Sequence, residues 1–475
     1  MLLRQIYDGD LSQYAYVIGC EKTREAIVID PERDVDRYLA IATGEGLKLN
    51  AVAETHIHAD FVSGARELAC DPGMRVFLSA EGGPDWQSEW ARNLANVTWL
   101  RDGDTFKVGN IRFQALHTPG HTPEHLSYLV TDEGSGANEP IALLSGDFLF
   151  VGDAGRPDLL QTAAGIAGTA EEGAHQLYSS LRRIANLPCH VQILPAHGSG
   201  SACGKSLGAV PSSTAGYEIK FNPTWKLAIE GPAQVFVDFI LRNQPEPPFY
   251  FARMKRVNRS GPAVLGGISE PRQLTIDEVI GRLDDPTLAV LDTRADRAAF
   301  MKAHLPGSLY APAKGSFSDF AGSYLRPDER IVLVVDSANQ VEEQVRRLIR
   351  IGFDKIEGWL GVAALASTNG TLASIRSVKF RELPALMAEE PDNLVLDVRS
   401  AAEHEGRHLR GALSVAHTRL QARVAEVPAN RTVIVHCQSG NRAAPSAAYL
   451  ERNGRQSIYV NDAFGNVPAE LLTQP

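Results

Sequence analysis

Residues 49–61 read LNAVAETHIHADF, a segment in which an apolar, strand-forming stretch continues directly into an HxHxD pattern. Alternate side chains at the end of a strand point in the same direction, so His56, His58 and Asp60 can reach one cleft. Imidazole and carboxylate groups are common metal ligands. This segment predicts a metal site at the end of a buried strand, and the alternative for this segment alone is a solvated polar loop.

The same arrangement returns further along the chain. Three more strand-forming segments are each followed by a His or an Asp: residues 111–116 before His121, 141–144 before Asp147, and 191–194 before His197. Four strand ends that deliver these residue types in this order resemble the metallo-β-lactamase superfamily, over roughly residues 1–250. The resemblance implies an αββα sandwich with a metal in the cleft between its two sheets.

The residue after the HxHxD pattern bears on the number of metal ions. Hydrolases of the superfamily such as glyoxalase II carry HxHxDH, and the last His serves a second metal, whereas this chain has Phe61 there. This loss disfavours a dinuclear centre and leaves one set of ligands: His56, His121 and Asp147. Two imidazoles and one carboxylate with open positions suit non-haem Fe(II) and oxygen chemistry. We therefore expect one Fe(2+) per chain.

Persulfide dioxygenases of this superfamily use such a triad, and the resemblance extends to neighbouring residues. It implies that three residues orient the ligands or shuttle protons, although each can equally be a structural polar group: His58, Asp60 and His197. Residues 152–158, GDAGRPD, resemble the Gly-Arg-x-Asp segment of these enzymes. Arg156 is expected either to steer an anionic persulfide or to form an ordinary salt bridge with Asp158.

Cys203 follows His197 by six residues, within the sequence GSACGKS. Lys205 and the neighbouring glycines can lower the pKa of this thiol and make it a sulfur relay. The alternative is an inert thiol.

A second reactive segment lies near the C-terminus, where residues 433–442 read VIVHCQSGNR. An apolar strand ends at Cys437, and a turn then leads into a helix-forming stretch, so backbone amides, the helix dipole and Arg442 can stabilise a thiolate and an anion. The Cys-x-x-x-x-Arg spacing resembles the active-site loop of rhodaneses, which carry sulfur as a cysteine persulfide. Cys437 and Arg442 are the predicted catalytic residues, and four residues between them are predicted to bind substrate: Gln438, Ser439, Gly440 and Asn441.

The region before this loop contains a related copy of the same unit. Residues 289–294 and 330–335 are echoed by residues 394–399 and 431–436. Superimposing the two copies puts Asp336 at the position of Cys437 and Val341 at the position of Arg442, so we expect the first copy to be a catalytically defective scaffold. The predicted α/β architecture has three domains: 1–255, metallo-β-lactamase-like; 256–373, inactive rhodanese-like; and 374–475, active rhodanese.

Composition limits the partners. The 475 residues carry a formal net charge of -10 and a pI near 5.8, which argues against a nucleic-acid or anionic-membrane partner. No apolar stretch approaches the roughly 18 residues of a membrane span. The five cysteines are scattered, without a CxxC pair, as expected for free thiols in a reducing compartment. We therefore expect a cytoplasmic protein.

Taken together, the chain resembles fusions of a persulfide dioxygenase with rhodanese domains, in particular bacterial sulfide-detoxifying enzymes of the Cst sulfur-transferase type. The resemblance implies oxidation of a low-molecular-weight thiol persulfide by O2 to sulfite, and conversion of sulfite plus persulfide to thiosulfate through a Cys437 persulfide. The resemblance does not identify the thiol carrier, and a homo-oligomer is expected by analogy. Two alternatives remain: a dinuclear zinc thioester hydrolase like glyoxalase II fused to a rhodanese, and a protein that binds or senses sulfane sulfur.

Overall fold

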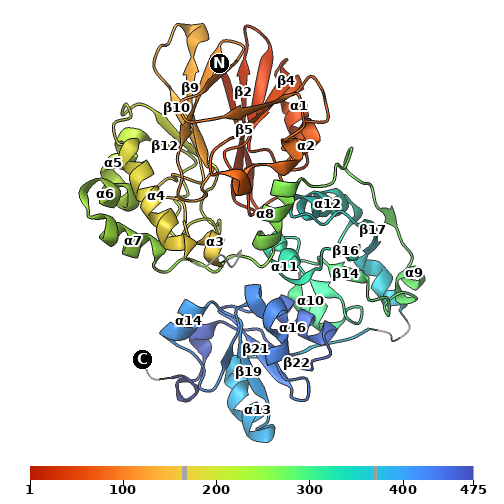
Figure 1. Cartoon of the computed structure of the whole chain (residues 1–475). Helices are drawn as coiled ribbons and strands as arrows, with labels where there is room; N and C mark the ends of the chain where they lie inside the picture. Colours follow the sequence, from red (N-terminus) through yellow and green to blue (C-terminus); the bar gives the residue numbers. More distant parts are fainter. Residues whose placement is uncertain (163–167, 369, 371, 474–475) are drawn as a thin grey trace. The chain divides into compact units, whose positions relative to one another are not determined.

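A computed structural model describes residues 1–162, 168–368, 370 and 372–473. The chain divides into two compact units: one contains Met1–Ile268 with Arg350–Gly352, and the other contains Ser269–Ile349 with Phe353–Pro475. Each unit is built on two β-sheets with helices around them (Figure 1). Within the described ranges, no helix combines the length and the apolar character needed to cross a membrane.

The first unit holds two six-stranded sheets. Their strand orders are β1-β2-β3-β4-β5-β6 and β12-β11-β10-β9-β8-β7. The bounds of the first sheet are β1 (Leu2–Asp8), β2 (Gln13–Cys20), β3 (Glu25–Ile29), β4 (Lys48–Ala53), β5 (Arg75–Ser79) and β6 (Val97–Leu100). Those of the second are β7 (Thr105–Val108), β8 (Ile111–His117), β9 (Leu126–Asp132), β10 (Ala142–Gly146), β11 (Gln192–Pro195) and β12 (Ser213–Thr214).

The core of this unit lies between the two sheets. Side chains alternate along a strand, so Tyr16 and Ile18 of β2 enter a cluster shared with Phe113 and Tyr128 of the second sheet. Val17, between them in sequence, belongs to a different cluster on the outer face. Each sheet therefore buries one face against the other sheet and leaves its second face for helices.

Helices cover both outer faces (Figure 1). Tyr38 of α1 (Asp36–Gly44) and Leu68 of α2 (Ala65–Leu68) join the outer cluster of the first sheet. The second sheet packs against α4 (Thr169–Arg183), α6 (Pro223–Glu230) and α7 (Ala233–Leu241), through residues that include Trp225 and Phe236. The predicted αββα sandwich is confirmed. The remaining helices of the unit are α3 (Leu159–Thr162), α5 (Ala215–Phe221) and α8 (Phe251–Ser260).

The second unit contains two five-stranded sheets whose strand pairs are all parallel, with equivalent orders, β13-β17-β16-β14-β15 and β18-β22-β21-β19-β20. The strands of the first are β13 (Arg272–Gln273), β14 (Leu288–Asp292), β15 (Leu309–Tyr310), β16 (Arg330–Val335) and β17 (Ile356–Gly361). Those of the second are β18 (Arg376–Val378), β19 (Leu394–Asp397), β20 (Leu413–Ser414), β21 (Val433–His436) and β22 (Ser457–Val460). This shared order agrees with the internal repeat read from the sequence.

Helices connect the strands of both copies. Their bounds are α9 (Ile276–Ile280), α10 (Arg297–Lys302), α11 (Phe317–Tyr324), α12 (Val341–Arg350), α13 (Leu383–Glu389), α14 (Ala401–Gly406), α15 (Leu420–Arg423) and α16 (Ala443–Arg452). Asp336 follows β16 as Cys437 follows β21, since these strands hold the same position in their sheets. The predicted domain bounds, and the catalytic defect of the first copy, stay predictions.

Candidate metal centre and sulfur-transfer site

Three of the predicted ligands converge at the ends of strands in the first unit. His56 follows β4, His121 follows β8, and Asp147 follows β10 directly. One potential ligand atom from each lies within 4.8 Å of the others, and Asp147 Oδ2 is 3.4 Å from His121 Nε2 and 3.9 Å from His56 Nε2. All three side chains are buried. The structure therefore brings together two imidazoles and one carboxylate from three separate segments.

The polar atoms at this point lack ordinary partners. Within the described part of the chain, His56 Nε2 and both carboxylate oxygens of Asp147 accept or donate no hydrogen bond. A buried polar atom without a partner costs about 1–3 kcal/mol. Burial lowers the pKa of His56 and of His121, which keeps both rings in the neutral form that a metal requires. A metal ion would satisfy these atoms, so the site fits one.

Each histidine is oriented by a hydrogen bond at its other nitrogen. His121 Nδ1 donates to the Arg156 carbonyl at 3.0 Å, which leaves the Nε2 lone pair free for a ligand. The Thr55 hydroxyl donates to Asp30 Oδ2 at 2.8 Å and lies 3.0 Å from His56 Nδ1, from which it accepts. Such contacts fix the tautomer and direction of a metal-binding ring.

A second group of possible ligands adjoins the first. Potential ligand atoms of Asp60, His197 and Cys203 lie within 4.8 Å of one another. His197 Nε2 is 3.2 Å from Asp60 Oδ2 and 3.3 Å from Asp147 Oδ1, so Asp147 borders both groups. Phe61 is fully buried, and its ring packs on His58 at a centroid distance of 4.3 Å. The absence of a histidine at position 61 therefore does not remove a second donor group, because Cys203 supplies a third donor.

The thiol of Cys203 is not activated in the way the sequence suggested. Burial raises its pKa to about 12, although nearby His197 acts in the opposite direction. Lys205 Nζ donates to the Phe239 carbonyl at 2.6 Å and lies over the Phe239 ring. The expectation that Lys205 lowers the pKa of Cys203 is wrong, since this pKa is raised and the Lys205 ammonium is bound to the Phe239 carbonyl. A relay role for Cys203 stays a prediction.

The side chain of His58 has other partners than those of His56 and Asp60, the other two residues of the HxHxD pattern. Its Nε2 atom is 2.8 Å from Glu54 Oε2 and 3.2 Å from Asp30 Oδ1. Asp30 also accepts from the Thr55 hydroxyl, which connects His58 to the bond that orients His56. These hydrogen bonds agree with the expected role of His58 in orienting a metal ligand, here His56.

Arg156 forms the salt bridge that was one of its two expected roles. Its Nη2 and Nε atoms donate to the Asp158 carboxylate at 2.7 and 2.9 Å, and its Nη1 donates to the Ala202 carbonyl at 2.9 Å. The side chain is 1% exposed. These contacts occupy the guanidinium, so the structure favours the structural role over the steering of a substrate.

The predicted sulfur-transfer site is a compact loop in the second unit. Cys437 follows β21 and is 1% exposed, and the Gly440 N–H donates to its Sγ at 3.1 Å. Gly440 has a φ of +87°, and the Tyr459 hydroxyl donates to its carbonyl at 3.2 Å. Arg442 lies beside the thiol but forms a bidentate ion pair with Glu403 at 2.6 and 2.7 Å. The loop thus points an amide at the sulfur, as an anion site needs.

The first rhodanese-like copy also contacts this loop. Arg297 donates to the Ser439 carbonyl at 3.1 Å and to the side chain of Asn441. Two of the predicted substrate-binding residues are therefore held by the other copy. Asp397 and Arg399, at the end of β19 and just after it, form a buried ion pair at 2.6 Å.

Comparisons with known proteins agree with this geometry. Residues 8–197 match the Metallo-beta-lactamase superfamily, and residues 380–463 match the rhodanese-like domain. The bovine (Bos taurus) protein named persulfide dioxygenase ETHE1, mitochondrial, is 30% identical over 199 residues, which are 42% of this chain and 68% of the relative. The chain belongs to the metallo-β-lactamase superfamily.

Two further relatives of the chain show which kinds of enzyme the superfamily contains. A human hydroxyacylglutathione hydrolase-like protein is 34% identical over 185 residues, 39% of this chain and 55% of that protein. A solved metallo-beta-lactamase structure from Staphylococcus aureus subsp. aureus COL is 38% identical with a TM-score of 0.66, and the match covers 76% of this chain and 99% of that one. The relatives include both a dioxygenase and a hydrolase, so they indicate a metal-dependent enzyme and leave the metal open.

A cavity next to the candidate metal centre is lined by residues that the sequence did not indicate. This cavity, of about 830 Å³, lies beside the metal centre, since Ile57 and Gly120, neighbours of two candidate ligands, form part of its lining. Trp86 and Lys255 also line it. Neither belongs to a motif, and only the fold brings them to the cleft. Glu124, which accepts a hydrogen bond from the Ile57 N–H at 2.9 Å, could have been recognised from the sequence, because it stands in the HTPGHTPEH segment that contains His121.

Proposed function

We propose that the chain is a mononuclear non-haem iron persulfide dioxygenase coupled to a sulfurtransferase. It would oxidise a low-molecular-weight thiol persulfide with O2 to sulfite, and then combine sulfite with a second sulfane sulfur to give thiosulfate. The observation that carries this proposal is the His56, His121 and Asp147 group, with its buried, unsatisfied ligand atoms. Two histidines and one carboxylate with open positions are the donor set of non-haem Fe(II) oxygenases.

His56 and His121 would hold the ion through Nε2, and Asp147 would neutralise part of its charge. Ferrous iron bound there supplies the electron exchange with O2 that side chains alone cannot provide. The reaction balances as persulfide plus O2 plus water giving thiol, sulfite and two protons. Thr55 and the Arg156 carbonyl fix the direction of the two rings. These bonds keep the ligand atoms pre-positioned while substrate enters and product leaves.

The second half-reaction would use Cys437. Its thiolate attacks the sulfane sulfur of a persulfide, forming a Cys437 persulfide and releasing the thiol. Sulfite then attacks the outer sulfur of this persulfide, giving thiosulfate and restoring the thiolate. The Gly440 amide contact to Sγ and the adjacent Arg442 support this role, because both stabilise negative charge at the sulfur.

Anaerobic purification followed by metal quantification and O2 uptake with glutathione persulfide tests the proposal. We expect one iron per chain and O2 uptake, and loss of both in His121→Ala. Cys437→Ser should keep O2 uptake and release sulfite where the parent protein yields thiosulfate. Unchanged thiosulfate output in Cys437→Ser would refute the role of the C-terminal domain.

A second candidate is a dinuclear zinc thioester hydrolase, and one observation favours it. The Asp60, His197 and Cys203 group provides donors for a second ion next to Asp147, and thiolate, imidazole and carboxylate are zinc ligands. Two zinc ions per chain, with hydrolysis of S-lactoylglutathione in the absence of air and no O2 uptake, would establish this function and exclude the dioxygenase.

A further inference from the structure

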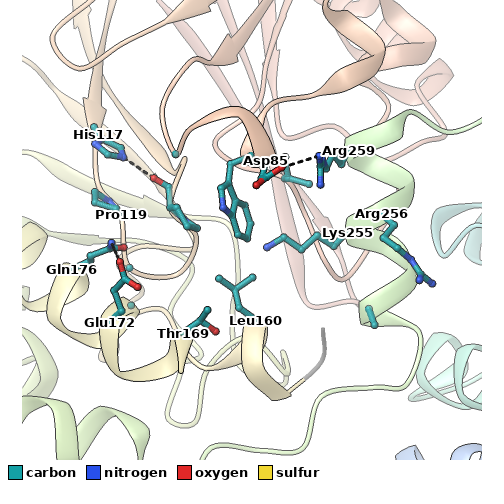
Figure 2. A pocket seen from close by; sticks show the side chains of 17 residues that line it. Asp85, His117, Pro119, Leu160, Thr169, Glu172, Gln176, Lys255, Arg256 and Arg259 are labelled. Atoms are coloured by element: carbon teal, nitrogen blue, oxygen red, sulfur yellow. Dashed lines mark hydrogen bonds and ion pairs between the residues drawn. The ribbon is translucent and has the colours of Figure 1, made fainter. Parts of the chain in front are cut away.

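The cavity beside the metal centre has an uneven charge distribution. Helix α8 contributes three basic residues to its lining: Lys255, Arg256 and Arg259. Arg259 is already paired, at 2.9 Å with Glu89 and 3.6 Å with Asp85. Arg256 is exposed and points away from Lys255, whereas Lys255 extends from the helix into the cavity (Figure 2). Lys255 is therefore the basic group that reaches the interior.

The ammonium of Lys255 has a partly desolvated environment. Nζ lies 3.8 Å from the centroid of the Trp86 ring, a cation–π arrangement. Burial lowers the pKa of Lys255 to about 7, and the nearby Glu124 carboxylate opposes this shift. Among the described residues, no carboxylate comes within salt-bridge distance of Nζ. A cation held on an aromatic face without a direct anionic partner is suited to accept one from a ligand.

The position of this cation relative to the metal centre limits what it can hold. Burial is the main reason that the pKa values of His56 and His121 are lowered, and the positive charge of Lys255 acts on both rings in the same direction. Ile57 and Gly120, which flank the candidate ligands, line the same cavity. A ligand with its sulfur at the metal centre would therefore extend its remaining atoms past Lys255. The volume of about 830 Å³ is within the range of small-molecule sites.

We propose that Lys255 is a specificity-determining residue that binds a carboxylate or phosphate of the thiol carrier, and so selects anionic carriers over neutral ones. This inference rests on the proposed persulfide dioxygenase function. The charge bound is on the carrier, not on the reacting sulfur, so the contact contributes to substrate binding and leaves the chemical step unchanged. A charge-assisted hydrogen bond of this kind contributes about 1.5–3 kcal/mol, or roughly 10–100-fold in KM.

The test compares two persulfides in O2-uptake kinetics: that of glutathione, whose carrier is anionic, and that of N-acetylcysteamine, whose carrier is neutral. Lys255→Met should raise KM for glutathione persulfide roughly 10–100-fold, with kcat and iron content near those of the parent. Its KM for the neutral persulfide should change less than about twofold. Lys255→Arg should retain most of the selectivity. Lys226→Met, at an exposed lysine of α6, is the matched control.

Other outcomes separate this inference from the proposed function. An equal loss for both persulfides in Lys255→Met would overturn the inference, because it would place the charge at the sulfur or give the lysine a structural role. If the iron-loaded parent took up no O2 with any persulfide, the proposed function would fail. The inference would then be decided by calorimetric binding of glutathione itself, which the parent should bind and Lys255→Met should bind at least about tenfold more weakly.

Discussion

The hydrogen bond from His56 to Thr55 offers a sharp test of the metal centre, because it can be removed without touching a ligand. In Thr55→Val the side chain keeps its shape and loses its hydroxyl. His56 Nδ1–H then has no acceptor in a buried position, or the proton moves to Nε2, where it blocks the ligand lone pair. Either outcome penalises the form of the ring that binds metal.

The magnitude follows from the contact that is lost. Leaving one buried donor unsatisfied costs about 1–3 kcal/mol. Loss of such an orienting contact typically weakens metal affinity roughly 10–100-fold. We therefore expect Thr55→Val to bind Fe(II) about 10–100-fold more weakly than the parent, and Thr55→Ser, which keeps a hydroxyl, to stay within a few-fold of it.

The assay is anaerobic competition for Fe(II) against a chromogenic chelator. Thr131→Val is the matched control, since Thr131 is also buried, accepts a hydrogen bond from Arg112 at 3.3 Å, and belongs to β9 of the same sandwich. Unchanged Fe(II) affinity in Thr55→Val would refute the assignment of His56 Nε2 as a ligand atom. An equal loss in Thr131→Val would show a general effect on the fold.

Two further predictions concern the rhodanese domain. In Gly440→Ala, the φ of +87° and a Cβ placed 2.6 Å from the Tyr459 hydroxyl should distort the loop. Alkylation of Cys437 should therefore slow roughly tenfold, while O2 uptake stays unchanged. An unaltered alkylation rate would contradict the role of the Gly440 amide. Burial favours the protonated form of Asp397, but Arg399 and His436 hold its pKa at about 2. This depressed pKa corresponds to roughly 2 kcal/mol of stability that is present above pH 4 and lost as the pH falls toward 2. Asp397→Asn should therefore weaken hydrogen-exchange protection of β19 at pH 7 and about half as much near pH 3, and a deficit that stays constant with pH would count against the ion pair.

Much of the metal centre could be read from the sequence, because its ligands follow strands that are themselves recognisable. The apolar segments before His56, His121 and Asp147 are β4, β8 and β10 of the sandwich. The Cys437 loop is local in the same sense, since the strand, the turn and the helix that shape it are consecutive. The repeat of the rhodanese unit could also be recognised from the sequence, because two copies of the same strand pattern fold into two sheets with the same strand order.

The predicted common direction of the HxHxD side chains was not found. Past Ala53 the chain is no longer a strand, so the alternation of side chains ends there. His56 faces the candidate metal, His58 binds Glu54 and Asp30, and Asp60 faces His197. The local pattern identified the right residues and could not assign their partners.

The sequence alone determined which residue types stand at the strand ends and at the turn after β21, since those features depend on neighbours a few positions away. Only the tertiary structure decided that Cys203 adjoins Asp60, that Glu403 pairs with Arg442, and that Lys255 reaches the cavity. Lys255 is 199 positions from His56 in the chain, and no periodicity or spacing links segments so far apart. Their meeting depends on how the sheets and helices pack, which is a property of the whole fold.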